Sequence, residues 1–189
     1  MTLPVFTVGH SNRSIAVFLE ILRAHGVRRI VDVRRHPHSR KWPHFDAGAL
    51  AERLRGAGID YVGMPELGGR RKPRPDSPHT AWRVDAFRGY ADFMDTPEFH
   101  GALDPVVALS QTESTALMCA EALPWRCHRS LIADALLARA LPVREILSVK
   151  EARPRQLPAF ARLDGERVVY DVGELPLGRS SRSIKSSAT

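Results

Sequence analysis

Short apolar runs alternate with amphipathic stretches along most of this chain, and this alternation limits the fold more than any other feature. Five apolar runs have the length of strands: 4–8, 29–33, 59–62, 116–119 and 143–147. Helical spacing or capping signals mark five helices: 14–25, 46–55, 86–94, 97–109 and one opening at 127–130. The alternation predicts an α/β fold with a mainly parallel sheet and helices on both faces.

The end of the chain departs from this pattern. Two short runs, 159–163 and 167–170, flank Asp164-Gly165, and this dipeptide is a strong signal for a β-hairpin. The last dozen residues are poor in apolar side chains, which is typical of disorder. We therefore expect one α/β domain over 1–175, ending in a small hairpin, and a disordered tail over 176–189.

The composition is that of a soluble globular protein, with 43% hydrophobic and 26% charged residues. No apolar run approaches the roughly 18 residues of a membrane span, and the first residues do not resemble a signal peptide. Two cysteines are too few for a disulfide framework, which favours a reducing compartment. We expect a cytoplasmic protein with no membrane partner.

The net charge of +7 favours a polyanionic partner, either nucleic acid or a phosphorylated small molecule. Two basic loops, 34–41 and 68–83, have Trp42, Phe45 and Trp82 in or beside them. Arginine beside aromatic rings suits phosphate contact and base stacking. The same pattern also fits a solvated basic face over buried rings. Arginine is spread along the whole chain, so the positive charge could also reflect overall composition and not a partner.

Unusual polar residues follow the predicted strands at the points where these strands end. The segments are Gly9-His10-Ser11, Asp32 with Arg34, Pro65-Glu66-Leu67, and Cys119 with Glu121. The carboxyl ends of parallel strands meet at one edge of a sheet, where open α/β folds bind ligands. The sequence therefore predicts an active site at this edge.

Glu121 is the leading candidate for acid–base chemistry. It follows a buried strand, so we expect partial desolvation that raises its pKa, although Arg126 and Arg129 would act in the opposite direction. A structural carboxylate paired to arginine is the alternative. Asp32 is the second candidate for activating water, or it only orients Arg34 or His10.

Further roles follow from the same expected edge. His10 would orient groups or shuttle a proton, while Arg34 and Arg129 would hold phosphate. No nucleotide cofactor is expected, because neither a Gly-x-Gly-x-x-Gly nor a Walker-type loop follows any strand.

Cys127 and His128 open the last predicted helix, and a helix N-terminus can stabilise a thiolate. Cys119 reads as a buried strand residue. Six residues without glycine separate Cys119 from Arg126, which argues against a phosphatase-type loop. A metal site of Cys119, Cys127, His128 and His10 lacks both CxxC and HxxxH spacing, so we expect no metal.

Several long motifs carry a family resemblance: TVGHSNRS, VDVRRHPHSR, YVGMPELGGRRKPRPDSPHTAWR, FRGYADFM and LMCAEALPWRCHRSLIADAL. Over about residues 5–165 the chain resembles the family called domain of unknown function 488, whose function is unsettled. The resemblance implies an α/β fold. It also implies importance for the matching residues Gly9, His10, Ser11, Asp32, Arg34, Pro37, Ser39, Glu66, Gly68, Gly69, Glu121, Cys127, His128 and Arg129.

We interpret the chain as an enzyme acting on nucleic acid or a nucleotide-like phosphorylated substrate, a hydrolase or transferase. Cleavage of an N-glycosidic bond is favoured over phosphodiester cleavage, because no clear metal set is present. The candidate catalytic residues are Glu121, Asp32, His10, Cys127 and His128. The candidate binding residues are Ser11, Arg34, Ser39, Glu66, Gly68, Gly69, Arg70, Arg126 and Arg129. The alternatives are a non-catalytic nucleic-acid-binding module, and thiol redox or sulfur chemistry at Cys119 and Cys127.

Overall fold

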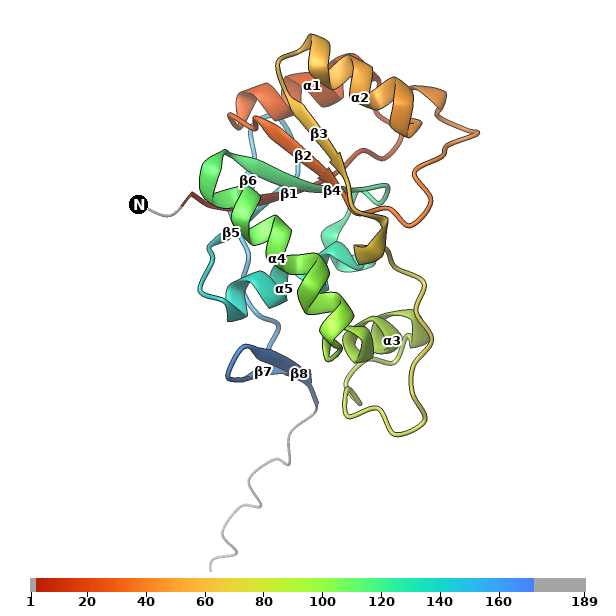
Figure 1. Cartoon of the computed structure of the whole chain (residues 1–189), viewed down its shortest axis with the longest axis vertical. Helices are drawn as coiled ribbons and strands as arrows, with labels where there is room; N and C mark the ends of the chain where they lie inside the picture. Colours follow the sequence, from red (N-terminus) through yellow and green to blue (C-terminus); the bar gives the residue numbers. More distant parts are fainter. Residues whose placement is uncertain (1–2, 172–189) are drawn as a thin grey trace, which may run out of the picture.

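A six-stranded sheet forms the centre of the computed structural model, which describes residues 3–171 (Figure 1). Five parallel strands are β1 (Val5–Gly9), β2 (Arg29–Asp32), β3 (Asp60–Gly63), β4 (Thr115–Cys119) and β5 (Val143–Ile146). A short antiparallel strand, β6 (Ala152–Pro154), pairs with β5. The order β3-β2-β4-β1-β5-β6 places β4 between β1 and β2 and confirms the mainly parallel α/β prediction.

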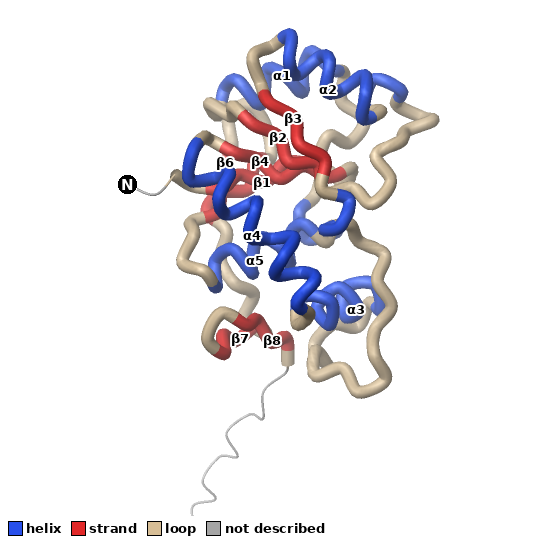
Figure 2. The backbone as a smooth tube through the Cα atoms, in the orientation of Figure 1, coloured by secondary structure: helices blue, strands red, loops and turns tan. Residues whose placement is uncertain are grey.

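Helices cover both faces of the sheet, as expected (Figure 2). The helices α1 (Ile15–Ala24) and α2 (Ala47–Gly56) pack Phe18 and Leu50 on one face. On the other face lie α3 (Asp85–Met94), α4 (Pro97–Thr112) and α5 (Arg129–Ala138), which contribute Leu103 and Leu131. Two apolar clusters therefore sandwich the sheet, and the strand ends remain free for a site.

Side-chain caps mark the starts of helices α1 and α4. Ser14 accepts a hydrogen bond from the Val17 amide, and Thr96 caps α4 in the same way. Helix α4 continues three residues beyond the expected end at Leu109. Three short 3₁₀ helices that we did not predict follow strands β2, β3 and β4, and each begins with proline: η1 (Pro43–Phe45), η2 (Pro65–Leu67) and η3 (Pro124–Arg126).

The predicted C-terminal hairpin is present as β7 (Ala161–Asp164) and β8 (Arg167–Tyr170). Its turn is Gly165-Glu166, one residue later than predicted, because Gly165 takes the left-handed conformation (φ 62°). The predicted tail, 176–189, lies outside the described residues. Between residues 3 and 171, no helix is long and apolar enough to cross a membrane.

Polar contacts tie this hairpin to the helical face beneath it. Arg167 donates two hydrogen bonds of 2.7 Å to the carboxylate of Asp95, and His79 Nε2 donates a third at 3.1 Å. The other ring nitrogen of His79 accepts from the amide of Tyr170 at 3.2 Å. Burial alone would raise the pKa of Asp95, but the bonds from Arg167 and His79 outweigh burial and lower it.

We expect Asp95→Asn to lower the free energy of unfolding by about 2 kcal/mol, since hydrogen bonds to a charged group are worth roughly 1.5–3 kcal/mol. Because the pKa of Asp95 is lower in the folded than in the unfolded protein, its carboxylate stabilises the fold at pH values above the unfolded-state pKa, which is near 3.9 for aspartate. The difference between wild type and variant in urea unfolding should therefore shrink as the pH falls below about 4. Asp85→Asn is the matched control, because Asp85 is exposed and pairs only with Arg88 of its own helix. Equal losses in both variants would contradict the assignment.

Candidate active site

A pocket of about 560 Å³ opens at the carboxyl edge of the sheet, where the sequence predicts a site. The segments that follow β1, β2 and β4 supply much of its wall, and the loop after η2 and the start of α3 complete it. Its lining includes nine predicted site residues: His10, Arg34, Ser39, Gly69, Arg70, Glu121, Arg126, Cys127 and His128. The parallel sheet therefore brings together residues from four separate stretches of the chain.

The end of β1 lies directly against the loop that follows β4. The amides of His10 and Ser11 donate to the carbonyls of Cys119 and Ala120 at 3.0 and 2.9 Å, so the pairing of β1 with β4 continues past the strands. A side chain at Gly9 would collide with the main chain of Glu121. Glycine at this position lets the two loops approach each other.

Asp32 positions Arg34 and does not reach the pocket. Its buried carboxylate accepts hydrogen bonds from Nε (2.8 Å) and Nη2 (2.5 Å) of Arg34, and one from the Tyr61 hydroxyl (2.8 Å). The predicted role of Asp32 in activating water is therefore not supported by its position. The alternative that it orients Arg34 agrees with these contacts.

Arg34 is committed to protein partners as well. Beyond Asp32, its guanidinium donates to the Phe45 carbonyl at 2.8 Å and to Nε2 of His10 at 3.2 Å. Because arginine only donates, Nε2 of His10 accepts, and Nδ1 carries the proton and donates to the Ser11 carbonyl at 2.9 Å. Burial lowers the pKa of His10 to about 4, so the ring is neutral. Both nitrogens of His10 are thus engaged, an arrangement that agrees with the predicted orienting role and leaves no ring nitrogen free to move a proton.

Glu121 lines the pocket, but its side chain is exposed. The expectation of partial desolvation is wrong, because the loop turns outward directly after the buried strand. Glu121 is the only carboxylate among the residues that line this pocket. It is therefore free to act on a bound molecule.

Arg129 was expected to hold phosphate, and the structure contradicts this. It is fully buried, does not line the pocket, and donates to the main-chain carbonyls of Glu121 and Ala122. The first turn of α5 points its side chain back under the loop, while the 3₁₀ turn η3 leaves Arg126 exposed at the pocket. Arg129 therefore holds the loop, and Arg126 is the cation that a ligand would meet.

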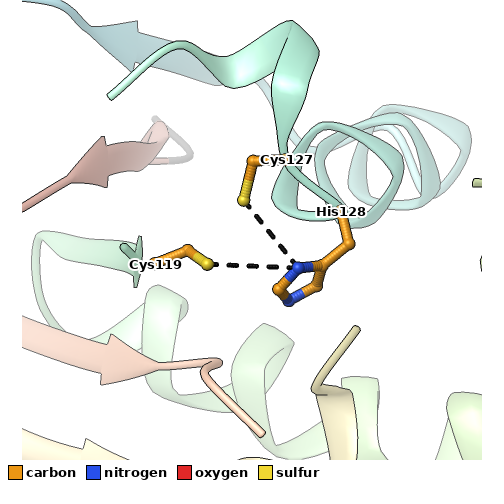
Figure 3. Close-up of side chains that lie close together, drawn as sticks. All are labelled: Cys119, Cys127 and His128. Atoms are coloured by element: carbon orange, nitrogen blue, oxygen red, sulfur yellow. Dashed lines mark hydrogen bonds between the residues drawn. The ribbon is translucent and has the colours of Figure 1, made fainter. Parts of the chain in front are cut away.

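The two cysteines and His128 form a cluster at the pocket wall (Figure 3). Nδ1 of His128 lies 4.0 Å from Sγ of Cys119 and 3.8 Å from Sγ of Cys127. The hydrogen bond from Cys119 lowers the pKa of Cys127 to about 7 against the effect of burial, and Arg129 lowers it further. The same bond and burial raise the pKa of Cys119. Cys127 is therefore the more acidic thiol of the pair.

The remaining predicted site residues lie around this pocket or away from it. Ser39 accepts a hydrogen bond from the Trp42 amide at 3.0 Å and orders the loop after β2. Ser11 and Gly68 do not line the pocket, and Gly68 packs tightly against the main chain of Arg35. Glu66 lines a different hollow, beside Phe93 and Glu98. The prediction that Glu66 belongs to the same site is therefore wrong.

Several lining residues were not among the predicted site residues. Arg35, His36 and His38 stand beside Arg34 in the basic loop, so the charge run was the available signal. Val84, Ala86 and Phe87 come from the N-cap and first turn of α3 and complete the lining. No sequence pattern links this helix start to the strand edge.

Gly69 is a sensitive point of the site, because a methyl group there would lie 2.9 Å from Nδ1 of His128. We expect Gly69→Ala to displace the imidazole, to change its distances from the thiols, and to cost about 1–3 kcal/mol of stability. Urea unfolding and the NMR signals of the His128 ring measure both effects. Gly101→Ala is the control: Gly101 sits in α4 with open space around it, so the change should stabilise by roughly 0.5–1 kcal/mol. An unmoved His128 ring in Gly69→Ala would refute the expected clash.

Comparison with known proteins adds one positive finding. No curated protein and no solved structure matches the chain significantly. A family model described as Domain of unknown function DUF488 matches residues 14–136, which is more than half of the chain and includes every lining residue except His10. The resemblance seen in the sequence motifs is thereby confirmed. The chain belongs to the DUF488 family.

Proposed function

We propose that this protein is an enzyme that hydrolyses or transfers a group on nucleic acid or a nucleotide-like phosphorylated substrate, bound in the pocket at the carboxyl edge of the sheet. The observation that carries the proposal is the charge of the lining. Four arginines, Arg34, Arg35, Arg70 and Arg126, line the pocket against the single carboxylate of Glu121. Four histidines also line it: His10, His36, His38 and His128. A volume of about 560 Å³ suits a nucleotide-sized ligand.

The exposed cations of the lining are available to an anion. Arg70 and Arg126 form no ion pair or side-chain hydrogen bond within residues 3–171, and Arg35 makes only a 3.5 Å contact to the Gly69 carbonyl. Like charges held close together repel each other, and a phosphate relieves this repulsion when it binds. Arg34 is buried, and it adds positive potential to the pocket while keeping its hydrogen bonds to Asp32.

Glu121 is the group best placed for acid–base work. In a hydrolysis, its carboxylate accepts a proton from water, the water oxygen bonds to the sugar carbon, and the N-glycosidic bond breaks. The proton then passes from Glu121 to the departing base. In a transfer, an acceptor hydroxyl takes the place of water. One free carboxylate with several phosphate-binding cations favours N-glycosidic cleavage over phosphodiester cleavage, which generally uses two metal ions.

Thiol redox or sulfur chemistry is the second candidate, because the fold brings Cys119 and Cys127 together beside His128. Both cysteines are free and both line the pocket. Free thiols also support a cytoplasmic, reducing location. This candidate uses the same pocket but places the reacting atom on sulfur.

Glu121→Gln should retain binding of labelled single-stranded DNA or RNA and lose at least about 100-fold in release of free base, as expected when a general base is removed. Fluorescence anisotropy measures the binding, and chromatography of the released bases measures the reaction. Glu52→Gln, an exposed change on α2, is the control and should behave as wild type. The catalytic proposal fails if wild type releases no base, and binding without turnover would identify a non-catalytic binding module.

Arg126→Ala and Arg70→Ala should each weaken binding and reduce the slope of log affinity against log salt by about 1, because each removes one phosphate contact. Arg55→Ala is the matched control, since Arg55 lies in the last turn of α2, away from the pocket. The same anisotropy titration, repeated from low to high salt, gives the slopes. Slopes that do not differ between these variants and wild type would remove the pocket as the binding site.

A further inference from the structure

Three donor atoms of the kind that bind soft or borderline metals converge at the pocket wall (Figure 3). They are Sγ of Cys119, Sγ of Cys127 and Nδ1 of His128, and all lie within 4.8 Å of one another. Cys119 ends β4, and the other two residues directly precede α5. Two elements of the core therefore fix the cluster.

The protonation of His128 is set by a bond on its far side. Nε2 lies 3.0 Å from the Val33 carbonyl, which can only accept, so Nε2 carries the proton. Nδ1 is then the nitrogen with a free lone pair, and it faces both sulfurs. Metal-bound histidines in proteins commonly donate their second N–H to a carbonyl or carboxylate in this way.

We propose that Cys119, Cys127 and His128 bind one Zn²⁺ ion, with the fourth coordination position open to the pocket. Zinc with sulfur at about 2.3 Å and nitrogen at about 2.1 Å places tetrahedral ligand atoms about 3.6–3.8 Å apart. The observed S···N distances of 3.8 and 4.0 Å are within a few tenths of an ångström of this spacing. All three residues line the pocket, so a water or a substrate oxygen can reach the ion.

This site departs from the sequence-based expectation of no metal. That expectation rested on missing CxxC and HxxxH spacings, which describe ligands taken from one turn or one helix. Here Cys119 comes from the end of a strand. Cys127 and His128 come from the start of the following helix, eight and nine residues later. His10, the fourth residue considered, is excluded because both of its ring nitrogens have partners.

The role of the ion rests on the proposed function, whereas its binding does not. Cys119, Cys127 and His128 would hold the ion, which would make a water in the pocket more acidic, and Glu121, which lines the same pocket, would accept the proton of that water. The water oxygen would bond to the substrate, the bond to the leaving group would break, and the proton on Glu121 would pass to the leaving group. Such a site would hydrolyse its substrate without a thiolate nucleophile.

Metal binding is tested on the full-length protein, reduced and freed of metal by a chelator, with no substrate present. Co²⁺ is added as a spectroscopic substitute for Zn²⁺. We expect one equivalent to give thiolate-to-cobalt charge-transfer absorption and the intense visible bands of tetrahedral Co²⁺. Added Zn²⁺ should remove both features, and competition with a chromophoric chelator then gives the zinc affinity.

Variants identify the ligands. Cys119→Ser and Cys127→Ser should each lose the charge-transfer intensity of one sulfur and weaken Zn²⁺ binding at least about 100-fold, because a thiolate ligand is removed. His38→Ala is the control, since His38 lines the same pocket outside the cluster and should keep the wild-type spectrum. A wild-type Co²⁺ spectrum of octahedral type, without sulfur charge transfer, would overturn the proposal.

Wild-type protein alone supplies a second test, which holds even if a cysteine variant fails to fold. Zn²⁺ should raise the urea midpoint in proportion to the logarithm of its free concentration, and Mg²⁺ should not. A Cys119–Cys127 disulfide that forms in air at the same rate with and without Zn²⁺ would refute the metal site and favour the thiol candidate. Salt-dependent oligonucleotide binding by metal-free protein tests the proposed function separately, so either idea can fail while the other stands.

Discussion

The main chain of the loop between β4 and α5 is fixed by contacts on two sides, and the geometry of the candidate site depends on these contacts. From below, the buried guanidinium of Arg129 donates to the carbonyls of Glu121 and Ala122. From the side, Gly9 allows β1 to approach the same main chain, and the amides of His10 and Ser11 extend the pairing. A loop fixed in this way can present the Glu121 side chain to solvent while its backbone stays rigid.

The arginines at this edge divide into two kinds with different tasks. Arg34 and Arg129 are buried: Arg34 donates to Asp32, to His10 and to a main-chain carbonyl, and the two terminal nitrogens of Arg129 donate to main-chain carbonyls, while its Nε has no partner among the described residues. Arg70 and Arg126 are exposed at the pocket. A buried cation is costly unless its hydrogen bonds are satisfied, so the first pair gives structure and a steady positive potential. The second pair, which has no side-chain partner in the part of the chain that the structure describes, can bind an anion.

Much of the fold could be predicted from the sequence because its signals are local. Apolar periodicity and the Ser14 and Thr96 caps mark elements that the structure confirms. Strand β6 was missed because it is three residues long, ends in proline and lies at a sheet edge, where packing contributes little pattern. The turn in the hairpin shifted by one residue because a left-handed glycine decides its position.

The site was less predictable, because its details depend on where side chains point after a strand ends. Arg126 and Arg129 are only three residues apart in the sequence. The 3₁₀ turn leaves Arg126 exposed, whereas the start of helix α5 buries Arg129. Glu121 was expected to share the burial of its strand, yet burial ends at Cys119 and the next residue is already exposed. Val84 and Phe87 reach the pocket from a helix far along the chain, and no local signal could show this.

The Cys119–Cys127–His128 cluster shows how the sheet order produces chemistry that no linear motif contains. Strand β4 lies between β1 and β2, so the end of β4 lies next to the segment in which the Val33 carbonyl follows β2. That carbonyl fixes the protonation of His128, and Gly69, which follows β3, gives the imidazole its space. Segments that follow three adjacent strands therefore set the direction of one nitrogen lone pair. A substitution in any of them that moves the ring should disturb the thiols without touching either cysteine.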